Sequence, residues 1–67
     1  MRWFSKKRAV RVHFADDSPS IDGIFLGTEA GHYVLAKAEL VREDDKVGLD
    51  GVTWIPKERV LFMQVTR

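Results

Sequence analysis

Apolar and polar residues alternate along this chain in short stretches, a pattern that predicts β-strands rather than helices. In the first stretch the apolar side chains Val10, Val12 and Phe14 face one way, and Arg11 and His13 face the other. Such a period of two is typical of a strand with one face in water. We expect five strands, at residues 9–14, 20–28, 32 to 41 or 42, 52–55 and 60–65.

Turn-forming residues separate these stretches. The breaks are an Asp-Ser-Pro cluster at 16–19, a short hairpin loop at 29–31, an acidic loop at 43–46, an Asp-Gly turn at 50–51 and the Pro-led segment 56–59. Pairing of residues 47–49 across the Asp-Gly turn stays open. Gly23 and Gly27 interrupt the second strand, which indicates a bend or bulge there. Five short strands without a helix predict an all-β fold, a small barrel over residues 9–67. Residues 1–8 precede it as an arm or a single helical turn.

The last predicted strand is apolar on both faces. Val60 and Phe62 point to one side, and Leu61, Met63 and Val65 to the other. A strand with one face in water should alternate instead, so both faces are expected to be covered. The alternative is a few exposed aliphatic side chains, which are common. We predict a subunit interface made by Trp54, Val60, Leu61, Phe62, Met63 and Val65.

Chain length, cysteine content and net charge limit the classes of protein to which this chain can belong. A chain of 67 residues forms one domain with a marginal core, and it has no cysteine for disulfides or thiolate metal sites. Oligomerisation is then the remaining way to add stability. The net charge of +1 argues against a general nucleic-acid binder. No apolar stretch approaches a membrane span and no signal peptide is evident, so we expect a cytoplasmic or virion location and no membrane partner.

Two segments carry a family resemblance. Residues 22–29, followed by 32–38, resemble the first motif of Sm and Sm-like proteins, with its two glycines, acidic residue and apolar strand. Residues 51–60 resemble the second motif, in which a strand leads through a tight turn into the last strand. The resemblance covers about residues 9–65. It implies a strongly bent, five-stranded Sm-like (SH3-like) barrel behind a short N-terminal helix, and rings in which the fourth strand of one subunit pairs with the fifth of the next.

The chain departs from the family where RNA-binding members hold uridine. Glu29 stands at an Asp position, His32 at an Asn position, and Pro56-Lys57 replaces Arg-Gly. The position that stacks on the base falls on Ala30 or Gly31, neither of which can stack, and base stacking is worth about 1–3 kcal/mol. The candidate RNA pocket is therefore Glu29, His32 and Lys57, as the alternative function.

The N-terminal arm combines aromatic and basic side chains. We predict that it docks on a partner through Trp3, Phe4, Lys6, Lys7 and Arg8. The simpler interpretation is that it caps the open end of its own barrel. A basic aromatic arm before a compact barrel is also similar to small head-region (minor capsid or decoration) proteins of tailed bacteriophages.

The sequence contains few combinations of residues suited to catalysis. Glu29 near His32 has no nucleophile or oxyanion donor beside it, and a tight hairpin forms no deep pocket. We expect no enzyme activity, cofactor, metal or small-molecule substrate. The sequence favours a structural module that forms rings or docks on a larger symmetric assembly such as a bacteriophage virion; an RNA-binding Sm-like ring is the alternative.

Overall fold

Strands make up about two thirds of the computed structural model, which describes residues 2–66, with side chains for residues 7–66. The elements are β1 (Arg2–Phe14), β2 (Ile21–Glu29), β3 (His32–Val41), β4 (Lys46–Gly48), β5 (Val52–Pro56), the 3₁₀ turn η1 (Lys57–Arg59) and β6 (Val60–Val65). The strands form one antiparallel sheet in the order β4-β3-β2-β1-β6, and β5 also pairs with β3. The predicted all-β class is confirmed.

The structure has six strands where the sequence predicted five. The additional strand is β4, which covers most of the segment whose pairing the sequence left open. It pairs back with the end of β3, where Val47 lies opposite Leu40 and Gly48 opposite Glu39. The Asp-Gly turn that follows therefore leads from β4 to β5 without joining two paired strands.

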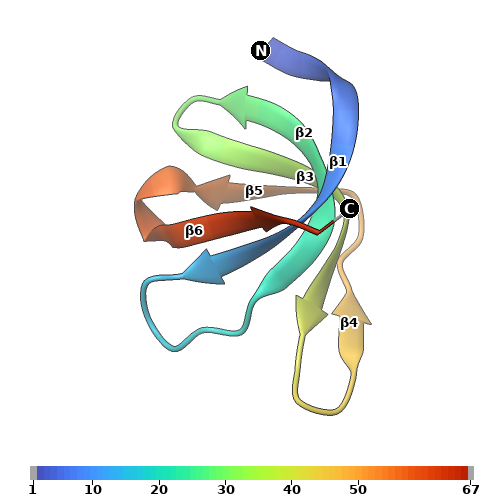
Figure 1. Ribbon diagram of the computed structural model, residues 1–67, viewed down its shortest axis with the longest axis vertical. Coiled ribbons are helices and arrows are strands. Elements are labelled where there is room, and N and C mark those ends of the chain that lie inside the picture. Colours follow the sequence, from blue (N-terminus) through green and yellow to red (C-terminus); the bar gives the residue numbers. More distant parts are fainter. Residues whose placement is uncertain (1, 67) are drawn as a thin grey trace.

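The N-terminal segment is extended. β1 begins at Arg2, which pairs with Thr28, and Trp3 pairs with Gly27. The register is then irregular until Arg8. The alternative of a helical turn is therefore wrong, because the backbone of residues 2–8 continues the first strand alongside β2 (Figure 1).

Two local features bend the sheet. The β2–β3 hairpin turns through Ala30 and Gly31, both with positive φ (50° and 77°), as a two-residue type I′ turn requires. Further along this pair the register shifts beside Gly23, opposite Lys37, which has a φ of 52°. A Cβ on Gly23 would lie 3.2 Å from the Ala36 carbonyl oxygen. The glycine predicted to mark a bulge thus allows close approach of β3.

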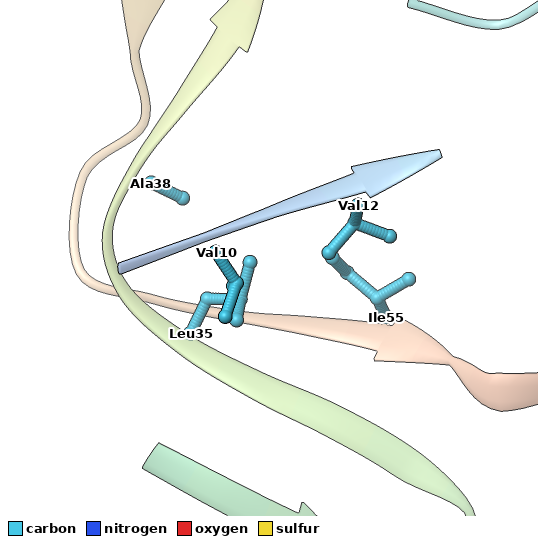
Figure 2. Close-up of a cluster of buried hydrophobic side chains, with 5 residues drawn as sticks. All are labelled: Val10, Val12, Leu35, Ala38 and Ile55. Atoms are coloured by element: carbon cyan, nitrogen blue, oxygen red, sulfur yellow. The ribbon is translucent and has the colours of Figure 1, made fainter. Parts of the chain in front are cut away.

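The bent sheet wraps around one hydrophobic cluster (Figure 2). Val10 and Val12 from β1 meet Leu35 and Ala38 from β3 and Ile55 from β5. All five side chains are at most 3% exposed. Strands far apart in sequence thus share one core, and this core positions the edges of the sheet.

The sheet remains open between β5 and β6. Within the described part of the chain, β5 pairs with β3 and β6 pairs with β1, and no pairing joins β5 to β6. η1 connects them, and the two strands run in opposite directions in Figure 1. Each of the two strands therefore has one edge without a sheet partner.

Candidate functional site

Large hydrophobic side chains gather on the two open strands. Among the described residues, the exposed ones are Val47, Val52, Trp54, Leu61, Phe62 and Val65. All but Val47 belong to β5 or β6. Scattered exposed hydrophobics are normal on protein surfaces, whereas here five of the six lie on the two open strands.

The predicted interface residues of β6 divide into two groups. Val60 and Met63 are half-buried against the core, while Leu61, Phe62 and Val65 are 63%, 48% and 58% exposed. The interpretation that Val60 and Phe62 share a face is wrong. The register of the β1–β6 ladder shifts between the pair His13–Phe62 and the pair Phe14–Val60. This bulge turns Val60 toward the core.

Phe62 already has a neighbour within its own chain. Its ring stacks on the His13 ring with centroids 4.3 Å apart and an angle of 22° between the planes. His13 Nε2 donates to Gln64 Oε1 at 2.6 Å, and Ser20 Oγ lies 3.3 Å from Nδ1. These contacts fix the outer face of β6 against β1.

An apolar pocket of about 410 Å³ lies beside β5. Its walls are Phe14, Pro19, Ile21, Leu40, Trp54 and Ile55. Ser18, Thr53 and Arg59 stand among its polar lining residues. The Arg59 guanidinium also lies 3.3 Å from Asp16 in the β1–β2 loop. The pocket thus separates β5 from the β1–β2 loop on the side where the sheet is open.

The residues of the alternative RNA pocket come together at the end of the β2–β3 hairpin. Glu29 pairs with His32, and the backbone N–H of Lys57 donates to Gly31 O at 3.0 Å. His32 Nδ1 donates to Ala30 O at 2.8 Å. Glu29 Oε1 is buried without a hydrogen-bond partner.

Two aromatic side chains of this region were not assigned to the pocket from the sequence. The Trp54 ring lies 5.6 Å from the His32 ring, and Lys57 Nζ lies 5.6 Å from the centre of the Tyr33 ring. Trp54 is 46% exposed. Its place beside His32 depends on the β3–β5 register, where it pairs with Val34, so local sequence could not reveal it.

Charged side chains form a network on another part of the sheet. The Asp22 carboxylate receives hydrogen bonds from Arg11 and from Lys46 Nζ, the latter at 3.0 Å. The Arg11 hydrogen bonds, assisted by Lys46, lower the pKa of Asp22 to about 2 against the opposing effect of its burial. The hydrogen bond and charge of Asp22 in turn raise the pKa of Arg11. The network ties three strands together, because Asp22 of β2 binds Arg11 of β1 and Lys46 of β4.

The predicted docking arm is only partly described. Lys7 and Arg8 are exposed, and the side chains of Trp3, Phe4 and Lys6 lie outside the described part. In the sheet, position 3 pairs with Gly27, Gly27 pairs with Val34, and Val34 pairs with Trp54. The four backbone positions therefore lie in one row across the strands.

Residues 2–66 show neither a metal-binding cluster nor a membrane-spanning helix. No three His, Asp or Glu side chains of this range gather where they could hold a metal ion. Nor does the range contain a helix with the length and hydropathy to cross a membrane.

The chain matches no family model, and no curated protein or solved structure matches it significantly.

Proposed function

We propose that this protein is a non-enzymatic assembly module whose copies join through the open edges of β5 and β6, forming an Sm-like ring. The observation that carries the proposal is the position of the exposed hydrophobics. Two strands that lack a partner on one side hold Val52, Trp54, Leu61, Phe62 and Val65. An unpaired apolar edge favours pairing with another chain, and it is a liability in a monomer.

The strand arrangement supports the Sm-like form of this proposal. β6 lies beside β1, β5 lies beside β3, and the short turn η1 separates them. This leaves the penultimate and last strands at opposite edges, the two strands that pair between subunits in the family that the chain resembles. Pairing β5 with β6 of the next copy repeats the same contact around an axis, and such heterologous contacts close into rings when the rotation allows.

A ring can also dock on a larger symmetric assembly. The basic segment before the barrel supports this extension, because Lys7 and Arg8 are exposed and suit an acidic partner surface. The likeness to head-region proteins of tailed bacteriophages belongs to this extension of the proposal.

The test is the mass of the protein in solution. Multi-angle light scattering should give an oligomer for the wild-type chain, and Val52→Lys on β5 or Val65→Lys on β6 should lower that mass while circular dichroism keeps its β-sheet signal. Val47→Lys is the matched control, because Val47 is also exposed but lies on β4. A wild-type chain that stays monomeric at high concentration contradicts the proposal.

RNA binding is the second candidate, favoured by one observation. Glu29, His32 and Lys57 meet at one end of the molecule, and Trp54 adds an exposed ring there. Base stacking on that ring would replace the missing stacking residue of the hairpin. Fluorescence anisotropy with oligo-uridine tests this candidate: submicromolar, uridine-selective binding that Trp54→Ala or Lys57→Ala removes would rank it above assembly. We expect weak, salt-sensitive binding instead.

A further inference from the structure

We infer that the apolar pocket beside β5 is the receptor for Leu61 of a second copy of this chain. The inference rests on the proposed function and deepens it. Edge pairing supplies the backbone contact, and insertion of the Leu61 side chain into the pocket, the leucine lock, supplies the specificity. Edge pairing by itself fits any extended strand, so a lock determines which strand is accepted.

The receptor half is built beside an open edge. Four consecutive residues of β5, from Thr53 to Pro56, line the pocket, and the β1–β2 loop provides Ser18 and Pro19 opposite them. A strand added along β5 would therefore run beside the opening of the pocket. Its side chains on that side would leave water for an apolar surface.

The inserting half is set by the bulge in β6. The ladder between β1 and β6 goes from the pair His13–Phe62 to the pair Phe14–Val60, so Leu61 has no residue opposite it. At 63% it is the most exposed of the large hydrophobics described. Bulges commonly redirect a side chain, and this one presents an unpaired leucine at the open edge.

The other side chains of β6 are less suitable. Phe62 is stacked on His13, and Val60 and Met63 pack against their own core. Val65 is exposed but lies at the end of the strand, opposite Val10. Leu61, the second residue of β6, is thus the exposed apolar side chain of this strand that has no residue opposite it in β1.

The arrangement makes the contact directional. Each copy has one pocket on β5 and one Leu61 on β6, so a pair of copies leaves one of each unused. Further copies add to both ends until the ring closes. A self-complementary contact, β6 against β6, would instead stop at a dimer.

Complementary variants test the lock. Leu61→Asp removes the inserting side chain and leaves the pocket intact. Ser18→Trp fills the pocket and leaves Leu61 intact; it is an exposed loop residue whose backbone N–H, bonded to Asp16, is kept. Pro19→Arg at the same opening is the second pocket variant. Each should weaken self-association about tenfold to a hundredfold in light scattering or sedimentation, the loss expected for exposing one leucine-sized contact. Val47→Asp is the control and should assemble like the wild type.

Mixing the variants gives the decisive result. Leu61→Asp retains a working pocket and Ser18→Trp retains a working leucine. An equimolar mixture should therefore form a discrete heterodimer of twice the 7.7 kDa chain mass and nothing larger. If the wild type assembles and Leu61→Asp or both pocket variants assemble equally well, the lock is wrong while edge assembly stands. Folded variants that are monomeric and stay monomeric on mixing also overturn the lock. A monomeric wild type overturns the lock together with the proposed function.

Discussion

Arg11 holds Asp22 with two hydrogen bonds, Nε to Oδ1 at 2.6 Å and Nη2 to Oδ2 at 2.9 Å. The two residues lie directly opposite each other in the β1–β2 ladder. Lys46, the first residue of β4, reaches the same carboxylate. One acidic side chain thus ties β1 and β4 to β2, and its charge state should affect the stability of the sheet.

The first prediction is an acid-induced loss of stability. The pKa of Asp22 is lowered from 3.8 to about 2 in the folded state, mainly by the Arg11 hydrogen bond. A lowered folded-state pKa stabilises the fold above the unfolded value, so this contribution is complete above about pH 4 and is lost as the pH falls toward 2. Allowing for the partial exposure of Arg11, Asp22→Asn should cost about 1 kcal/mol at neutral pH.

Urea unfolding followed by circular dichroism, from pH 7 to pH 2, measures this effect. The Asp22→Asn variant should lose the part of the acid dependence that lies between about pH 4 and 2. Asp44→Asn, on the exposed β3–β4 loop, is the matched control and should follow the wild-type curve. If Asp22→Asn instead keeps the full acid dependence, the tie does not contribute to stability.

The second prediction concerns Gly23. A methyl group there would meet the Ala36 carbonyl oxygen at 3.2 Å and Leu35 Cβ at 3.2 Å, both in the adjacent strand. Gly23→Ala should therefore lower the free energy of unfolding by about 1–3 kcal/mol, the usual cost of overpacking. Gly48→Ala meets nothing within 4 Å and should be neutral or slightly stabilising in the same denaturant titration. Equal stability of the two variants would contradict the close approach.

The third prediction concerns the core. Leu35 is fully buried and packs among residues of three strands. Leu35→Ala should cost about 2–5 kcal/mol through lost burial and a residual cavity. That is a large part of the stability of a 67-residue domain, so the variant should be largely unfolded in thermal melts at low concentration. Leu61→Ala, on an exposed side chain, should change the melt of the monomer little, and a similar effect of both variants would place the core elsewhere.

The fourth prediction separates the two roles of the N-terminal segment. Deleting residues 1–8 removes the pairs Arg2–Thr28, Trp3–Gly27 and Arg8–Phe25 but keeps Val10 and Val12 in the core. The truncated chain should retain its β-sheet circular dichroism and lose about 1–2 kcal/mol, a decrease of several degrees in Tm. An unchanged Tm would show that the segment adds nothing to the fold, and docking would then be its remaining role.

Much of the fold could be predicted because its signals are local. Alternation of side chains in residues 9–14 requires only that one face of a strand be buried, and Val10 and Val12 are buried. The hairpin at Ala30-Gly31 and the break at Pro56 follow from backbone chemistry within a few residues. The apolar character of both faces of residues 60–65 likewise predicted more hydrophobic side chains than one core face can cover, and Leu61, Phe62 and Val65 are exposed.

Other features depended on pairing between distant residues. β4 has three residues, too few for a period to show, and it becomes a strand only because the end of β3 offers it a partner. The bulge that turns Val60 inward and leaves Leu61 unpaired is a register shift between β1 and β6. Trp54 meets His32 through the β3–β5 register, and the pocket combines β5 with the β1–β2 loop. The sequence by itself determined where the five longer strands lie, since that depends on neighbouring residues. The tertiary structure decided that β4 pairs and which strand edges and side chains stay free, because register is set by packing across the whole sheet.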